Sequence, residues 1–414
     1  MNKEFYINNR KKLIEQMSDG EAIILFSGNE IRKTADENYS FFSNRNFVYL
    51  TGIYQENSVL VISKALGEVQ EKLYLLQVSE DREVWIGRKL RNSEATEISG
   101  IENIFNVDLL EQHLHSVIAK GEINCLLFDF DRLSFDQSDD VAHSFADKVK
   151  RFYPYIDLKN INPIICEFRK IKEPCEIEAV KKGMQITNAA ICSMIKNCKP
   201  DMKEYELEAE FNYVLAKHGQ RVPAFPSIIS SGNRNFYLHY SELMGQIKDG
   251  ELVLVDVGSG YDGYCTDISR VFPSNGKFSE IQALIYNIAL KSNREIMKKI
   301  KPGQPFSITN KTCQEVAFEG LRELGLIDDI KDIKKYVWHG TTHYVGLDVH
   351  DVGSYNGVMQ KNMIFTVDSG IYVREWGIGL RVEDNVLVTE NGCENLSKDI
   401  PVTIEEIESL MNKR

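Results

Sequence analysis

The sequence predicts an α+β protein in which an α/β N-terminal domain precedes a second domain built from a duplicated α+β unit. Two observations predict this fold class. About 160 residues at the N-terminus mix short β-rich runs with helical stretches. The remainder shows one order of elements twice: helix, Lys-Pro, helix, Gly, then strand-rich sequence with His and carboxylates. We therefore expect an N-terminal domain over residues 1–165 and a pseudo-twofold domain over residues 170–414.

The N-terminal domain contains five short apolar runs that are typical of buried strands. Each is rich in β-branched, aromatic or leucine side chains and is bounded by polar or turn residues. The five expected strands are AIILFSG (22–28), FVYLTGI (47–53), SVLVIS (58–63), KLYLLQV (72–78) and CLLFDF (125–130).

The second domain begins with a helix from Pro174, since proline suits the first turn of a helix. This helix ends at Lys199-Pro200, and a second helix follows over 205–219. The same order recurs from Ser279, which forms a capping-box signature with Gln282. That helix ends at 301–303, and a further helix runs through 310–325.

Composition excludes several classes of partner. The net charge of -12 argues against binding to nucleic acid or to an anionic membrane. The polar N-terminus has no apolar signal-peptide core, and no apolar run reaches the length of a membrane span. The eight cysteines are scattered without a CxxC pair, which favours free thiols in a reducing compartment. We expect a cytoplasmic protein.

The most informative feature is a pair of carboxylates on each of two expected hairpins. The pairs are Asp256 with Asp267 around residues 260–263, and Asp368 with Glu383 around residues 374–377. A turn at each midpoint would place the two carboxylates opposite each other, roughly 5 Å apart, where like charges are destabilising. A half-buried sheet carrying this arrangement twice indicates a bound cation.

Two motifs in this region resemble known sites but have the wrong context. Gly258-Ser-Gly260-Tyr-Asp-Gly263 matches a dinucleotide-binding fingerprint, yet β-rich sequence follows it where a helix is required. His339-Gly-Thr-Thr-His343 has the spacing of a zincin helix, but it lacks the glutamate and contains poor helix formers. We interpret the glycines as turn residues and reject both motifs.

Four carboxylates with one imidazole would suit Mn²⁺, Co²⁺, Fe²⁺ or Zn²⁺. Four carboxylates exceed the need of one dication, so two metals sharing ligands, about 3.5–4 Å apart, is the natural count. The spacing of Cys265 from Asp267 does not exclude a thiolate ligand, although a packed thiol is favoured.

Long segments of the chain resemble the aminopeptidase P and prolidase branch of the pita-bread metallopeptidases. The resemblance is carried by LVDVGSGYDGYCTDISRVFPSNGKFS, WHGTTHYVGLDVHDVG and IGLRVEDNVLVTENGCENL, and in the N-terminal domain by FFSNRNFVYLTGI and EVWIGRKL. It implies a creatinase/aminopeptidase P-like N-terminal domain followed by a pita-bread catalytic domain with pseudo-twofold symmetry.

The resemblance also implies a ligand set for two divalent ions. We expect Mn²⁺, with Co²⁺, Zn²⁺ or Fe²⁺ as alternatives. The implied ligands are Asp256, Asp267, His343, Asp368 and Glu383, of which Asp267 and Glu383 would bridge. Position 368 departs from the family pattern T-V-E-P-G-L-Y, because this chain has Thr366-Val-Asp368-Ser-Gly-Ile-Tyr372. Aspartate can still ligate a metal, but its carboxylate is one methylene shorter, so either the backbone approaches the metal or one metal is held less firmly.

Further residues receive roles from the same resemblance. His239 and His350 would contact the substrate and the tetrahedral intermediate, and Asp368 or Glu383 would take the proton from the nucleophile. Arg381 and Tyr372 would lie on the substrate side. Trp85 matches a tryptophan that reaches a neighbouring subunit's site in some oligomeric members, so we expect a homodimer or homotetramer.

The function implied is release of the N-terminal residue from peptides with proline in the second position, through a metal-bridging hydroxide. An Xaa-Pro dipeptidase is the alternative within the class, and a metal-free amidinohydrolase like creatinase is disfavoured by the nearly complete ligand set. A peptide-binding homologue weakened by Asp368 is the alternative from another class.

Overall fold

The computed structural model describes residues 1–413, and the chain divides into two compact units, one ending at Arg169 and the other beginning at Lys170. In the described part of the chain, no helix is long and apolar enough to cross a membrane.

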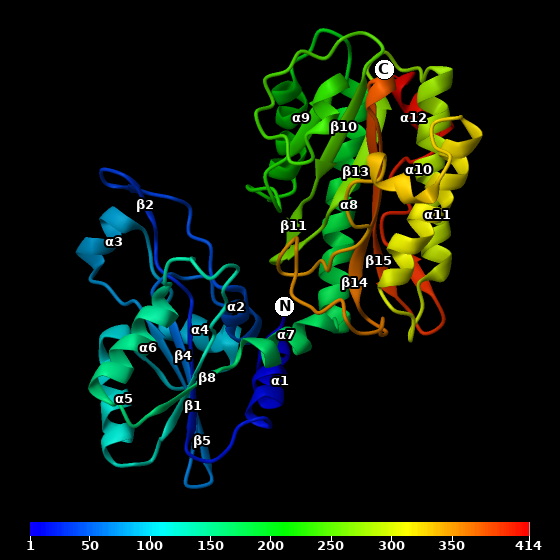
Figure 1. Ribbon diagram of the computed structural model, residues 1–414. Helices are drawn as coiled ribbons and strands as arrows, with labels where there is room; N and C mark the ends of the chain where they lie inside the picture. The colour runs from blue at the N-terminus through cyan, green and yellow to red at the C-terminus, as the bar shows by residue number, and fades with distance from the viewer. Residues whose placement is uncertain (414) are drawn as a thin grey trace. The chain divides into compact units, whose positions relative to one another are not determined.

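The first unit is built on a six-stranded sheet with strand order β6-β5-β4-β1-β7-β8 (Figure 1). Its strands are β1 Glu21–Phe26, β4 Val59–Ala65, β5 Glu68–Leu75, β6 Ile104–Asn106, β7 Cys125–Phe128 and β8 Asp157–Asn160, with a separate ribbon of β2 Arg32–Thr34 and β3 Glu37–Asn38. Its helices are α1 Lys3–Ile14, α2 Arg45–Thr51, α3 Glu80–Ile86, α4 Asn92–Ser99, α5 Leu110–Ala119, α6 Val141–Phe152 and α7 Asn162–Lys170.

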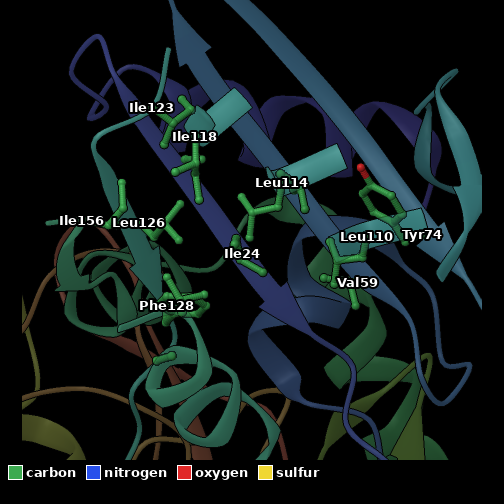
Figure 2. Packing of buried hydrophobic residues seen from close by; sticks show 14 residues of the cluster. Ile24, Val59, Tyr74, Leu110, Leu114, Ile118, Ile123, Leu126, Phe128 and Ile156 are labelled. Atoms are coloured by element: carbon green, nitrogen blue, oxygen red, sulfur yellow. The ribbon is translucent and has the colours of Figure 1, made fainter. Parts of the chain in front are cut away.

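Figure 2 shows the core on one face of this sheet, where Leu114 and Ile118 of α5 lie over Ile24 of β1 and Leu126 of β7. Each of these side chains is less than a tenth exposed. Burial of one such aliphatic side chain stabilises a fold by about 1.5–3 kcal/mol, so this layer holds α5 against the sheet.

Four of the five expected strands are present, but the strand predicted at 47–53 is wrong. This segment is α2, whose first turn is capped by Asn44, because its Oδ1 accepts from the Phe47 N–H at 2.8 Å. Gly52, with φ +73°, ends the helix in the left-handed region. Residues 46–51 are all buried, and a short run that is apolar on every side has no period to distinguish helix from strand.

The second unit contains the repeated order expected from the sequence. The first half has α8 Pro174–Asn197, α9 Glu204–Lys217, β9 Ile228–Ser231, β10 Leu252–Val257 and β13 Ile268–Pro273. The second half has α10 Glu280–Lys299, α11 Ser307–Glu323, β14 Ile364–Val373, β15 Ile378–Val388 and β16 Cys393–Asn395, followed by α12 Ile404–Met411. The sheets β13-β10-β9 and β14-β15-β16 meet where β13 lies beside β15 (Figure 1).

The hairpin of the second half has the register that the sequence predicts. Asp368 on β14 pairs directly with Glu383 on β15. The strands are joined by a short 3-10 turn over 374–376 and by Gly377, whose φ is +65°.

The hairpin of the first half turns one residue later than predicted, so its cross-strand pairing is shifted. Its tip is formed by β11 Gly260–Tyr261 and β12 Tyr264–Cys265, with positive φ at Asp262 and Gly263, as a two-residue type I′ turn requires. Asp256 therefore pairs with Ser269, so the expectation that it lies directly opposite Asp267 is wrong. Asp267 stands two residues from Ser269 and is diagonal to Asp256.

Both rejected motifs lie in non-helical sequence, as expected. Residues 258–263 run from the end of β10 through β11 into the turn at 262–263. A Cβ on Gly258 would stand 1.8 Å from the carbonyl oxygen of Thr266, so close approach of two backbones accounts for this glycine. Residues 339–343 form an irregular segment that runs beside β14.

Candidate active site

The two carboxylate hairpins and the segment beside β14 enclose a cavity of about 220 Å³. It is lined by Leu238, His239, Asp256, Asp267, His339, Gly340, His343, His350, Asp368, Arg381 and Glu383. The structure thus brings together all five predicted metal ligands with Arg381 and both predicted substrate histidines.

Backbone pairing explains how residues from outside the strands reach the cavity. The N–H groups of Thr366 and Asp368 donate to the carbonyl oxygens of His343 and Thr341, at 2.9 and 2.8 Å. The segment that carries His343 therefore behaves as an additional strand along β14. Asp267 is fixed by Asn385, which accepts from its N–H at 3.0 Å and donates to its carbonyl oxygen at 2.8 Å.

Carboxylate and imidazole atoms converge in two overlapping groups among the described residues. One consists of Asp256, Asp267 and Glu383, and the other of Asp267, His343 and His350, with one ligand atom from each residue within 4.8 Å of the others. Asp267 belongs to both groups. Asp368 lines the same cavity but belongs to neither group.

Three buried carboxylate oxygens have no hydrogen-bond partner in the described part of the chain. They are the Oδ1 atoms of Asp256, Asp267 and Asp368. An unsatisfied buried acceptor costs about 1–3 kcal/mol, and more when it is charged. Three such oxygens around one cavity fit a site whose partners are divalent cations, because oxygen-rich sets with one imidazole suit these ions.

Arg381 is a buried cation on the second hairpin, and it stabilises the first hairpin by binding Asp256. Its Nη2 donates to Asp256 Oδ2 at 2.6 Å, and its Nη1 donates to the Leu238 carbonyl oxygen at 3.1 Å. Ser269 lies beneath it and donates from Oγ to Glu383 Oε2 at 2.8 Å. One oxygen of Asp256 is thereby held in place, and the other remains available to a ligand.

His343 lies between the two hairpins. Its Nε2 is 3.3 Å from Asp267 Oδ2 and 3.7 Å from Glu383 Oε1, while its Nδ1 is 3.2 Å from the Tyr344 carbonyl oxygen. A histidine whose Nδ1 donates to a carbonyl presents Nε2 as its ligand atom.

Burial controls the protonation of this cluster. Burial raises the pKa of Asp267 and of Asp368 well above the ordinary aspartate value, and the nearby charge of Glu383 raises both further. Burial acts in the same direction on Glu383 and is the largest single cause, but His343, Arg381 and Ser269 together outweigh it, so the net pKa is lowered. Burial lowers the pKa of His343, yet hydrogen bonds to two carboxylates outweigh it and raise the pKa to about 11.

His339 is a cavity residue that the sequence analysis did not assign. Its Nδ1 is 3.3 Å from Asp368 Oδ2, and its Nε2 is 3.0 Å from the hydroxyl of Tyr372. From the sequence, the zincin spacing of His339 and His343 is rejected, and His339 is expected only to support the local loop. In an extended segment the same spacing places both side chains on one face.

The other predicted site residues occupy different positions. His239 and His350 are exposed on the cavity wall, and the rings of His350 and His343 lie 4.2 Å apart. Tyr372 is buried behind His339, where it stacks on Trp338 with ring centroids 4.3 Å apart. Trp85 lies on α3 of the first unit and is 87% exposed.

Cys265 is buried and donates its thiol to the Leu347 carbonyl oxygen, with sulfur and oxygen 3.7 Å apart. Neither metal-ligand group in residues 1–413 includes it. This placement agrees with the packed thiol that the sequence analysis favoured.

Family models match both units. The model for metallopeptidase family M24 matches residues 178–390, and the model for the aminopeptidase P N-terminal domain matches residues 6–126. The chain therefore belongs to metallopeptidase family M24, in its aminopeptidase P branch.

Individual relatives agree over nearly the full length. The Xaa-Pro aminopeptidase of Escherichia coli K12 is 31% identical over 435 residues, which cover 97% of this chain and 96% of that protein. A structure assigned as an aminopeptidase P from Bacillus anthracis is 38% identical with a TM-score of 0.98, and covers 100% of this chain and 99% of that one. Zinc-substituted E. coli aminopeptidase P in complex with product is 29% identical with a TM-score of 0.90, at the same coverage.

Proposed function

We propose that this protein is a metal-dependent aminopeptidase that releases the N-terminal residue from peptides with proline in the second position. The observation that carries the proposal is the cavity with three unpaired buried carboxylate oxygens, in a chain aligned end to end with Xaa-Pro aminopeptidases.

The ligands in this proposal are Asp256, Asp267, His343, Asp368 and Glu383, which supply oxygen and imidazole donors for two divalent ions. Mn²⁺ suits this donor set, and Co²⁺, Zn²⁺ and Fe²⁺ are the alternatives. When bound, such ions act as Lewis acids toward a carbonyl oxygen and activate water at neutral pH. Asp267 and Glu383 are the proposed shared ligands, since His343 lies within 3.7 Å of both.

Glu383 is the better candidate to take the proton from the attacking water. Its pKa is lowered despite burial, because His343, Arg381 and Ser269 stabilise the charged form. The pKa of Asp368 is raised by burial and by the charge of Glu383, so both act against the charged form that a base requires. A general base must be deprotonated at the working pH.

The histidines on the cavity wall are the proposed contacts to the substrate. His239 and His350 are exposed to the cavity and can donate hydrogen bonds to the scissile carbonyl as negative charge develops on its oxygen. The pKa of His350 is lowered by burial and by the positive charge of His343. His339 is oriented by Tyr372 and is a third candidate donor.

Arg381 positions Asp256 in this scheme, and its guanidinium also faces the cavity as a substrate-side cation. Tyr372 acts through His339. Trp85 stays a prediction that depends on a homodimer or homotetramer, in which an exposed tryptophan would meet a second copy of the chain.

The preference for proline follows from the chemistry of the bond. A proline nitrogen carries no N–H and fixes its φ near −65°, so general peptidases position this bond poorly.

Hydrolysis should be measured on Xaa-Pro-Yaa, Xaa-Ala-Yaa and Xaa-Pro peptides after loading with Mn²⁺. We expect cleavage of Xaa-Pro-Yaa alone at high rate, while preferred cleavage of Xaa-Pro would assign a dipeptidase.

A catalytically weakened peptide-binding homologue is the second candidate, favoured by one observation: Asp368 stands outside both groups of converging ligand atoms. In that case two metals bind but no Xaa-Pro peptide is cleaved. That result would refute the proposed enzyme.

A further inference from the structure

A buried ion pair includes the residue that follows the cavity residue His350, although neither member of the pair lines the cavity. Lys172 Nζ stands 2.8 Å from Asp351 Oδ2, and each side chain is only 1% exposed. Removing two charges from water costs more than their attraction returns unless the geometry is well matched, so a buried pair is weak support for stability. We therefore interpret the pair as a device that fixes one arrangement of the backbone, and not as a main source of stability.

The backbone in question carries two site histidines. Asp351 directly follows His350, and its N–H donates to the carbonyl oxygen of Tyr344 at 2.9 Å. Tyr344 directly follows His343. The hydrogen bond therefore closes a loop whose two ends hold His343 and His350, and the two rings meet edge to face.

Lys172 and Asp351 are fitted closely into this loop. A Cβ on Gly346 would stand 2.0 Å from Asp351 Oδ2 and 3.0 Å from Lys172 Nζ, so the loop passes over the ion pair only because residue 346 is glycine. The Gly346 carbonyl oxygen accepts from the Cys265 N–H at 2.7 Å. Lys172 itself is fixed at its N–H, which donates to the Asn362 carbonyl oxygen at 2.9 Å.

His350 itself is exposed and needs an external constraint. Its side chain borders the cavity on one side and the ring of His343 on the other. The backbone of the adjacent Asp351 is therefore the nearest fixed point. A displacement of about 1 Å in a catalytic group can cost about 100-fold in rate.

We propose that Lys172 is a positioning residue that acts through Asp351 to set the place of His350 toward the substrate. This inference rests on the proposed function. It predicts that Lys172→Met lowers kcat by about 100-fold with little change in KM, because the interaction with His350 strengthens in the transition state.

A residue that only stabilises the fold would behave differently. Lys172→Met removes a positive charge 2.8 Å from the buried carboxylate of Asp351, so this variant is expected to lose stability. Lys172→Met combined with Asp351→Asn removes both charges and should recover the midpoint of thermal unfolding. Positioning predicts that kcat stays low in this double variant, whereas a purely structural role predicts that kcat recovers with stability.

The test combines steady-state kinetics on an Xaa-Pro-Yaa peptide with thermal unfolding and measurement of bound metal. The variants are Lys172→Met, the double variant, His350→Ala, and His350→Ala with Lys172→Met. Lys181→Met is the matched control, because it removes a lysine whose partner Glu394 lies 3.0 Å away in a pair that is more than a third exposed.

We expect unchanged metal content, a low kcat in the double variant, and no additional loss when Lys172→Met is added to His350→Ala. The inference is overturned if the folded double variant keeps kcat within about twofold of wild type, or if the two losses multiply. An inactive wild-type protein would instead contradict the proposed function.

Discussion

The two carboxylate hairpins occupy equivalent places in the two halves of the second unit, yet they hold their carboxylates differently. In the second hairpin, Asp368 and Glu383 are direct cross-strand partners. In the first, Asp256 pairs with Ser269 and stands diagonal to Asp267. The two halves share the face on which the carboxylates lie but differ in register, because a shift of two residues along a strand keeps the face.

The surroundings differ as well. Arg381 crosses from the second hairpin to bind Asp256 at 2.6 Å, so the first hairpin receives a full positive charge. Asp368 is approached by His339, whose pKa burial lowers, so this neighbour favours the neutral form. We infer that Asp256 is held in place before metal binds, whereas Asp368 depends more on the metal itself.

The largest effect should come from the carboxylates proposed to be shared between the halves. Asp267→Asn or Glu383→Gln is expected to lower kcat/KM by more than about 1,000-fold, because each removes a charge that the site uses toward two ions. Peptide hydrolysis with metal analysis measures this. Glu375→Gln, an exposed change in the turn of the second hairpin, is the control. Near-wild-type activity in either site variant would contradict the shared role.

The first hairpin also depends on a buried carboxyl on α8. Glu176 accepts a hydrogen bond from the Tyr264 hydroxyl at 2.7 Å, and burial raises the pKa of Glu176 to about 7. Between about pH 4.5 and 7 the folded state keeps a proton that the unfolded state loses, so stability falls as pH rises through this window.

Glu176→Gln should remove that cost. We expect the variant to be more stable than wild type by about 3 kcal/mol at pH 8 and similar to it near pH 4. Chemical denaturation of metal-loaded protein at both pH values checks this expectation. A difference between variant and wild type that does not change with pH would show that Glu176 does not titrate in this range.

Metal affinity should depend on pH. The carboxylates of Asp267 and Glu383 raise the pKa of His343 to about 11 against the effect of burial, so this imidazole holds a proton near neutrality when no metal is bound. Burial also shifts the pKa of Asp267 and of Asp368 upward. Metal binding must then release protons, so affinity rises with pH by about tenfold per unit for each proton released. Calorimetry in buffers of different ionisation enthalpy counts these protons, and a count of zero would contradict the protonated cluster.

The smallest expected effect compares the same substitution in the two halves. Asp368→Glu restores the longer side chain of the family pattern and should raise kcat/KM by several-fold up to about tenfold. Asp256→Glu should lower it, because the extra methylene must displace Arg381. Parallel kinetics and metal titrations measure both. If Asp368→Glu lowers metal affinity and turnover together, the site has adapted to aspartate.

Much of the site could be predicted because the two carboxylates of each hairpin stand at similar distances on either side of a turn signal, and strand alternation then fixes their common face. The register of the first hairpin could not, because it depends on Asp262 and Gly263 adopting positive φ, which moves the turn by one residue. His339 was missed because its place in the cavity depends on a pairing with β14 from a distant part of the chain.

In the fold, too, features set by neighbouring residues could be predicted, whereas features that depend on burial by the rest of the chain could not. The capping box of Ser279 with Gln282 is present at the start of α10, as a local signal should be. The sequence predicts a strand at 47–53 where the structure has a helix, because an apolar segment buried on all sides has no period that distinguishes the two. Its helical state is set by the cap at Asn44 and by Gly52.

Anomalous diffraction at the manganese edge, from crystals grown with Mn²⁺, tests the central claim most directly. We predict two anomalous peaks per chain between the hairpins, both adjacent to Asp267 and Glu383, with the weaker one beside Asp368. One peak only, or peaks that do not contact both hairpins, would contradict a dinuclear site built from the two halves.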